Sequence, residues 1–367
     1  MTRHRLLLLS VGSQVGQGVL RTLSDRRANL ELVATSSTSH EPSVFDFDAA
    51  YLTPRSAADP EGFERKLIDI MERERIDLVM PCRDDDVVLV SSLAERRSDL
   101  APRLLCGSAA SAEVIADKWS SFEFSTKHGL PFAASMIRCA ARERKAFVRK
   151  YGLPLVAKPR RGFASLDVYM LYKAEQVETM LARDGYIVQQ FLGDPTRITD
   201  YLAAIDESGV PLNHSFQGVK HSIQALIAPD GSVVHVICTR NYRNLRRSKY
   251  VEPDTDPTSA AVGAACARAF SSAGWRGPLN IQCEKTAAGE MLIHEFNGRF
   301  TSATVDRWLL GFDEVGAAIE HFTGRAVATT LPPANAALEA FQSLVARAAD
   351  PDDVAALQRD GVWRRPR

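Results

Sequence analysis

The sequence predicts an α/β region at the N-terminus followed by an α+β region, and three observations predict this. Short apolar runs alternate with amphipathic segments through the first hundred residues, which is typical of parallel strands joined by crossover helices. Apolar strand pairs flank Asp230-Gly231 and Ala288-Gly289 in the second half, which indicates antiparallel hairpins. The length of 367 residues exceeds that of a typical single core and favours two or three domains.

The N-terminal elements are expected in strand-helix-strand order. Strands are expected at residues 5–11, 31–37 and 76–82, and helices after Gly12 and around residues 61–75. The basic residues before the first leucine run imitate a signal peptide. That apolar stretch ends in Gly-Ser-Gln after about six residues with no small-residue cleavage site, so a buried strand fits better.

Two features of this region permit more than one interpretation. Gly12, Gly16 and Gly18 follow a strand and open a helix, where a dinucleotide fingerprint would lie. Their spacing is not G-x-G-x-x-G and no acidic residue ends the next strand, so we favour a tight turn with close helix packing over a dehydrogenase site. Residues 84–86 are three aspartates that could bind a metal ion, but acids in the first turn of a helix are the favoured interpretation.

The second half begins with a helix that ends at Gly129 and an extended run that ends at Lys158. We expect a strand at 186–192, hairpins over 222–240 and 278–300, and helices at 258–274 and 313–324. These changes of character divide the chain into residues 1–105, 106–185 and 186–330, with a C-terminal tail at 331–367.

Charge and cysteine usage exclude several classes of function. Lysine plus arginine and aspartate plus glutamate number 45 each, which removes a global electrostatic argument for nucleic acid or an anionic membrane and favours small-molecule substrates. The six cysteines have no paired spacing, so they indicate buried thiols in a reducing compartment. No stretch reaches the roughly 20 apolar residues of a membrane span. We therefore expect a cytoplasmic protein.

The stretch IHEFNGRFTSA at 293–303 carries the chemistry. Glu295, Asn297 and Arg299 recur every second residue, so on a strand they would share one face. A carboxylate and an amide oxygen are hard donors that suit Mg²⁺, and a guanidinium suits a phosphoryl group. Lys158 ends an apolar strand before a turn rich in small residues, another place for a phosphate. Each feature alone is more simply a solvated strand face, whereas their order along the chain favours nucleotide chemistry.

The order of Lys118, Lys158 in PLVAKPRRGFAS, VQQFL, the Asp230-Gly231 hairpin, NIQ and HEFNGRF resembles the ATP-grasp superfamily, in particular its carbamoyl-phosphate-synthetase-like branch. The resemblance runs from about Leu6 to Val327. It implies a Rossmann-like pre-ATP-grasp domain followed by a two-lobed ATP-grasp fold, and it explains a Rossmann-like start without a dinucleotide fingerprint.

The resemblance also implies roles for individual residues. ATP-binding positions match Lys118, Lys158, Gly162, Ala164, Ser165, Gln190, Phe191 and Leu192, the last three being the hinge whose backbone reads adenine. Positions for Mg²⁺ (or Mn²⁺) match Gln282, Glu295 and Asn297. Arginines near the γ-phosphate and the acyl-phosphate intermediate match Arg299 and Arg240.

The sequence departs from the family pattern at two places. Lys220 stands where the family has a ribose-binding glutamate, and Gln224 stands where it has a further acid. Asp194 or Asp200, from the insertion at 193–217, could bind the ribose in place of that glutamate. The first metal position is occupied by Gln282, with Glu284 two residues further on as the alternative.

The resemblance implies an ATP-dependent ligase that activates a small carboxylate, an amino acid or related acid, as an acyl phosphate and joins it to an amine. Two alternatives stay open: a kinase or carboxylase of the same fold that forms no amide, and a nucleotide-binding regulatory protein with altered catalysis. The partners implied are carboxylate and amine substrates, no nucleic acid and no membrane, with a homodimer left open.

Overall fold

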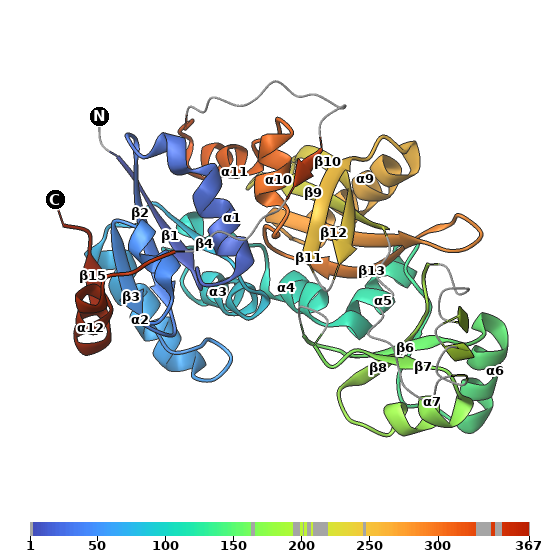
Figure 1. Cartoon of the computed structure of the whole chain (residues 1–367). Helices are drawn as coiled ribbons and strands as arrows, with labels where there is room; N and C mark the ends of the chain where they lie inside the picture. The colour runs from blue at the N-terminus through green and yellow to red at the C-terminus, as the bar shows by residue number, and fades with distance from the viewer. Residues whose placement is uncertain are drawn as a thin grey trace.

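The structure is a computed structural model that describes residues 3–162, 166–193, 199–200, 202–203, 207, 219–244, 247–327, 339–341 and 347–366. Within these residues the strands form a five-stranded, a four-stranded and a six-stranded sheet. Figure 1 shows the five-stranded sheet at the left, the six-stranded sheet at the upper right and the four-stranded sheet below it, with α4 and α5 crossing the space between them. This α/β and α+β composition confirms the predicted fold class.

The N-terminal sheet has the order β15-β3-β2-β1-β4, with β3, β2, β1 and β4 parallel. Its elements are β1 (His4–Leu9), α1 (Gln14–Thr22), η1 (Ser24–Arg26), β2 (Leu30–Ser36), η2 (Pro42–Asp46), β3 (Ala49–Leu52), α2 (Pro60–Arg73), β4 (Leu78–Pro81), α3 (Asp84–Arg96) and η3 (Ala101–Arg103). Leu6 to Leu9 are fully buried because β1 lies between two strands and is covered on both faces. The apolar run at the N-terminus is therefore a buried strand.

The glycine-rich turn after β1 packs tightly. A Cβ on Gly16 would lie 2.6 Å from the Cα of Val11, and a Cβ on Gly12 would lie 2.5 Å from a carboxylate oxygen of Glu41. The hydroxyl of Ser13 accepts a hydrogen bond from the Gly16 amide and caps α1. Close packing against the backbone thus explains Gly16, and the Glu41 carboxylate beside Gly12 disfavours a dinucleotide phosphate there.

The four-stranded sheet has the order β5-β8-β6-β7 and its strands are antiparallel. It follows two connecting helices, and the elements are α4 (Ala109–Ala116), α5 (Lys118–Lys127), β5 (Ser135–Met136), α6 (Ala141–Tyr151), β6 (Leu155–Pro159), β7 (Tyr169–Leu171), α7 (Ala174–Leu181) and β8 (Tyr186–Gln190). Leu155, Val177 and Val188 belong to its small core. This sheet presents Lys158 at the end of β6.

The six-stranded sheet has the order β13-β12-β9-β10-β11-β14 and is antiparallel. Its elements are β9 (Val219–Ile227), β10 (Val233–Asn244), β11 (Arg247–Pro253), α9 (Pro257–Ser272), β12 (Gly277–Lys285), β13 (Met291–Asn297), α10 (Thr304–Leu309), α11 (Glu314–Thr323) and β14 (Ala340–Phe341). Phe270, Trp275 and Phe296 pack in the core between this sheet and α9. Both predicted hairpins are confirmed as β9–β10 and β12–β13.

The C-terminal residues add to the N-terminal sheet. After α12 (Pro351–Asp360), strand β15 (Val362–Arg364) pairs antiparallel with β3, and Figure 1 shows both red elements beside the blue sheet. Trp363 is buried and Arg364 forms an ion pair with Glu74. The segment treated from the sequence as a tail therefore supplies an edge strand.

Two further properties follow from the described residues. No helix among them is both long and apolar enough to cross a bilayer. All six cysteines are free thiols; Cys82, Cys106, Cys266 and Cys283 are buried, whereas Cys139 and Cys238, which were also expected to be buried, are half-buried.

Candidate active site

Strand β13 presents Glu295 and Asn297 on the same face because they are two residues apart. In the register with β12, Glu295 lies opposite Gln282 and Asn297 opposite Asn280. The strand ends at Asn297, so Arg299 is not part of it, contrary to the expectation of one continuous strand face. Its Nη2 nevertheless donates a hydrogen bond of 3.1 Å to Oδ1 of Asn297. The three polar groups are therefore brought together by a strand and the bend that follows it.

Lys118 is the first residue of α5 and approaches Glu295 from the connecting helices. Its Nζ lies 3.3 Å from Oε1 of Glu295 and donates a 3.1 Å hydrogen bond to the carbonyl of Gly162. Asp117 caps α5 by accepting from two backbone amides and forms a 2.8 Å ion pair with Arg160. The cap thus fixes the start of α5 against the residues that follow β6.

Lys158 lies buried at the end of β6 and donates a 3.0 Å hydrogen bond to the carbonyl oxygen of His294. Burial lowers the pKa of Lys158 to about 7; the carboxylates of Glu295 and Glu284 oppose this shift, and the charge of Lys118 adds to it. A lysine that titrates near neutrality in a polar cluster is typical of a functional site.

Glu295 stays ionised in this cluster. Burial alone would raise the pKa of Glu295, but the charges of Lys118 and Lys158 outweigh burial and lower it. A half-buried carboxylate that stays ionised can serve as a ligand for a metal ion.

Arg299 contacts the N-terminal region as well as β13. Its Nη2 lies 2.7 Å from Oδ2 of Asp84, the first residue of α3. Burial would lower the pKa of Arg299, but the carboxylate of Asp84 outweighs it and raises the pKa. The three aspartates at 84–86 occupy the first turn of α3, as predicted, and one of them orients this arginine.

A cavity of about 730 Å³ lies between the N-terminal region and the strand that carries Glu295. Lys118, Gly162, Glu295 and Asn297 line one wall. Residues of α2, α3 and α4 line the other walls and supply both apolar and charged side chains. The polar cluster therefore opens into a space large enough for small-molecule substrates.

The hinge residues Gln190, Phe191 and Leu192 lie apart from this cavity, where β8 ends. The backbone N–H of Gln190 donates a 2.9 Å hydrogen bond to the carbonyl of Ala134, and the side-chain oxygen of Gln190 accepts a 3.1 Å hydrogen bond from the Ala134 backbone N–H. The next residue, Gly193, donates to the carbonyl of Lys285 at 3.2 Å. These bonds hold the connection between the four-stranded and six-stranded sheets.

Of three other predicted site residues, one lies beside Glu295, one is paired elsewhere and one is outside the described residues. Gln282 is half-buried opposite Glu295. Arg240 lies on β10 and forms a 2.9 Å ion pair with Glu252; within the described ranges it makes no ion pair with Glu295. Ser165, with Ala164, lies outside the described residues.

Sequence reasoning did not find the ion pair between Lys220 and Glu284, in which Nζ and Oε1 are 2.6 Å apart. His294 Nε2 lies 3.6 Å from the same oxygen. The alternation of Gln282 and Glu284 on β12 was the available signal, but a pairing across strands needs the register. Asp194 lies outside the described residues, and Asp200 is exposed.

The donor set fits a nucleotide-bound Mg²⁺ better than a protein-only metal site. The part of the chain that the structure describes contains no group of three or more His, Cys, Asp or Glu side chains able to hold a metal ion. Mg²⁺ beside substrate phosphates needs only one or two protein carboxylates, and Glu295 with the amide oxygen of Asn297 meets that need.

No family model and no curated protein matches the sequence. The fold is therefore identified by comparison with solved structures. The biotin carboxylase domain of 2-oxoglutarate carboxylase from Hydrogenobacter thermophilus superposes with a TM-score of 0.64 at 14% identity, covering 90% of this chain and 72% of that one. The chain has the ATP-grasp fold. The N5-carboxyaminoimidazole synthetase of Staphylococcus aureus shares the fold with a TM-score of 0.66 at 10% identity, covering 90% and 80%.

An L-amino acid ligase from Bacillus licheniformis shares the ATP-grasp fold as well, with a TM-score of 0.59 at 15% identity, covering 88% of this chain and 75% of the ligase. The Hydrogenobacter domain was solved as a dimer with MgADP, ADP and bicarbonate, and the Staphylococcus enzyme with ADP. These ligands belong to those proteins. The fold they share supports the Rossmann-like first domain and the two-lobed remainder that the resemblance implies.

Proposed function

We propose that this chain is an ATP-dependent ligase that activates a small carboxylate, an amino acid or related acid, as an acyl phosphate and joins it to an amine, releasing ADP and phosphate. The observation that carries the proposal is the convergence of Lys118, Lys158 and Arg299 around Glu295 and Asn297. Three cations around two hard oxygen donors suit a triphosphate and its metal ion. The adjoining cavity offers room for the acid and the amine.

Each residue has a role in this proposal. Lys158 and Lys118 bind phosphate oxygens of ATP, and Arg299 offsets the negative charge that develops on the transferring phosphoryl group. Glu295 and Asn297 would hold Mg²⁺ (or Mn²⁺), which supplies charge neutralisation when bound. No nucleophilic side chain is required, because the carboxylate substrate itself attacks the γ-phosphorus and the amine then displaces phosphate.

The remaining residues complete the proposal. The backbone of Gln190, Phe191 and Leu192 reads the adenine, Gly162 and Ser165 contact the phosphates, Gln282 adds an oxygen near the metal ion, and Arg240 meets the acyl phosphate. The domain division at residues 105, 185 and 330 stays part of this proposal. So does a homodimer, because the Hydrogenobacter domain was solved as one.

The proposal is tested by the variant Glu295→Gln, which keeps the side-chain volume and removes the charge. Turnover of ATP with pooled amino acids should fall by roughly a hundredfold or more, because the variant loses the metal carboxylate. Glu290→Gln, an exposed position on the same hairpin, is the matched control and should keep full activity. Full activity in Glu295→Gln would refute the metal role.

A second candidate is a carboxylase that activates bicarbonate. It is favoured because the structures that share the fold include a biotin carboxylase domain solved with bicarbonate and an N5-carboxyaminoimidazole synthetase. ADP release that depends on bicarbonate and not on an amino acid would support it. A third candidate, a nucleotide-binding protein with altered catalysis, is favoured by the neutral Gln282 opposite Glu295. ATP binding without turnover in either assay would support that one.

A further inference from the structure

Glu284 extends from β12 toward the hinge. Its Oε2 lies 3.7 Å from the place where a Cβ on Gly193 would stand, and the ring of Phe191 lies 3.9 Å from that same place. The backbone brings these residues together, since the Gly193 amide bonds to the carbonyl of Lys285, the neighbour of Glu284. One side of the Glu284 carboxylate is therefore next to the segment proposed to read adenine.

The other oxygen of this carboxylate contacts two basic side chains. Oε1 of Glu284 lies 2.6 Å from Nζ of Lys220 and 3.6 Å from Nε2 of His294. The carbonyl oxygen of the same His294 accepts the hydrogen bond from Lys158. The negative charge of Glu284 also acts on Lys158, whose pKa it raises. Glu284 thus lies next to the hinge on one side and contacts His294, the residue whose carbonyl binds the buried lysine, on the other.

We propose that Glu284 binds the vicinal hydroxyls of the nucleotide's ribose and that Lys220 is the positioning residue that holds it there. The inference rests on the proposed function, which puts the base at the hinge and the phosphates at Lys158. In any nucleotide the sugar lies between these two parts, so the group between them on the protein meets the sugar. A carboxylate with two oxygens accepts a hydrogen bond from each hydroxyl of a vicinal diol.

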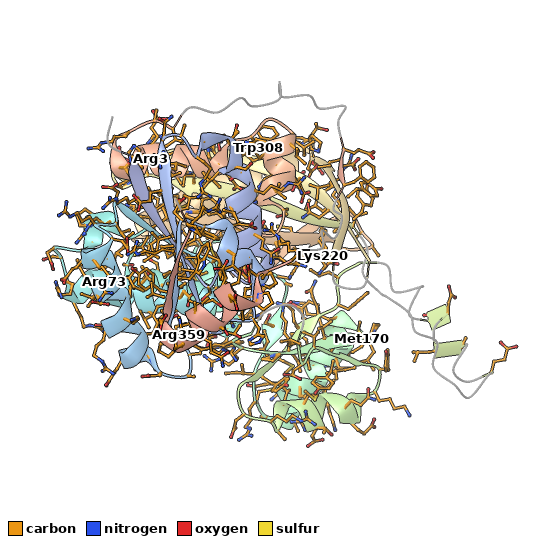
Figure 2. The ribbon with its side chains drawn as sticks, turned by 60° about the vertical axis from the view of Figure 1, so that its left-hand side comes forward. Arg3, Arg73, Met170, Lys220, Trp308 and Arg359 are labelled. Carbon is orange, nitrogen blue, oxygen red and sulfur yellow. The ribbon has the colours of Figure 1, made fainter. Side chains whose placement is uncertain are left out.

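The partner of Glu284 explains the unusual lysine on β9. Lys220 stands where the resemblance implies a glutamate. In the structure it forms an ion pair with Glu284, which lies on the adjacent strand β12. The side chains of Lys220 and Glu284 are 19% and 17% exposed, so the pair is largely shielded but remains open to a ligand. Figure 2 labels Lys220, the second residue of the inner strand β9, above the four-stranded sheet. The carboxylate that the resemblance implies on β9 is therefore found on the adjacent strand β12 in this chain.

The test measures binding and requires no turnover. The full chain is titrated calorimetrically with Mg²⁺ and ATP, 2′-deoxy-ATP or 3′-deoxy-ATP. The wild type should bind either deoxynucleotide roughly tenfold or more weakly than ATP, because one hydrogen bond to an ionised group is lost. Glu284→Ala should bind all three nucleotides with about equal affinity. If Glu284→Ala does not fold, Glu284→Gln removes the charge at conserved volume and should reduce the preference for ATP over both deoxynucleotides.

Lys220 and a matched control complete the design. Lys220→Met should reduce the preference for ATP over the deoxynucleotides, and Lys220→Arg should restore it, which a merely structural role would not predict. Glu290→Ala, an exposed carboxylate on the same hairpin, should keep the full preference.

The outcomes separate this inference from the function on which it rests. ATP binding with an unchanged preference for ribose in Glu284→Ala, or equal binding of all three nucleotides by the wild type, overturns the inference alone. Absence of any ATP binding by the wild type overturns the proposed function and the inference with it.

Discussion

Nη2 of Arg299 lies 2.7 Å from Oδ2 of Asp84, although 215 residues separate the two in sequence. The contact joins the end of β13 to the first turn of α3. The same nitrogen donates to Asn297 at 3.1 Å. The guanidinium proposed to meet the transferring phosphoryl group is therefore oriented by a carboxylate of the N-terminal region, so that region is part of the site.

This contact should couple the stabilities of the two regions. Asp84→Ala leaves the charge of Arg299 without its carboxylate in a largely buried place and should cost about 1–3 kcal/mol of unfolding free energy. Combined with Arg299→Met, the loss should be smaller than the sum of the single losses by about 0.5 kcal/mol or more. Urea unfolding of the four proteins in the cycle measures this. Strict additivity would show that the two side chains do not interact in solution.

The affinity for ATP should fall as the pH rises through about 7. The pKa of Lys158 is lowered to about 7, so above that pH the lysine is neutral and must take up a proton when it binds an anionic phosphate. Each further pH unit should weaken binding by up to roughly tenfold. Calorimetric titrations across this range measure the slope. Lys158→Arg, whose side chain stays charged, should bind with little pH dependence, and an equal slope in that variant would exclude Lys158 as the titrating group.

Lys158→Met should be more stable than the wild type while it loses ATP binding. The pKa of Lys158 is about 7 in the folded chain against 10.5 for an ordinary lysine, so between these values the unfolded chain binds more protons. The lysine therefore lowers stability most at and below pH 7, and wild-type stability gains from this group as pH rises. Denaturation of both proteins at acidic and alkaline pH measures the difference. A variant that is less stable than wild type at low pH would contradict this.

The C-terminal strand should contribute strongly to the N-terminal sheet. Trp363 is buried, and its ring meets Phe45 edge to face with centroids 5.1 Å apart. Trp363→Ala should cost about 3–5 kcal/mol, the usual loss for a large buried aromatic. Phe341→Ala, at a position that is 63% exposed, is the control and should change stability by about 0.5 kcal/mol or less. Equal effects of both variants in chemical unfolding would show that β15 is detached in solution.

The secondary structure that could be predicted from sequence is the part with strong local patterns. The leucine run of β1, the Asp230-Gly231 and Ala288-Gly289 turns and the alanine-rich α9 carry their own signals and are confirmed. The short strands β3, β5 and β15 carry almost none, because two to four residues form them and partners elsewhere stabilise them. The tail was separated from the N-terminal sheet for that reason.

The candidate site shows the same division. Glu295 and Asn297 could be placed together because a two-residue spacing puts them on one strand face. The partner Asp84 could not be found, because its position in the first turn of α3 has a sufficient local explanation. The pair of Lys220 and Glu284 depends on the register of separate strands, which sequence spacing does not determine.

The central claim is tested most directly by following carboxylate oxygen into phosphate. The chain is incubated with MgATP, an amine and a pool of amino acids whose carboxylates carry oxygen-18, and the phosphate released is examined by mass spectrometry. An acyl-phosphate ligase transfers one labelled oxygen to each phosphate and releases ADP. Release of AMP and pyrophosphate, or of phosphate without label, would contradict the account.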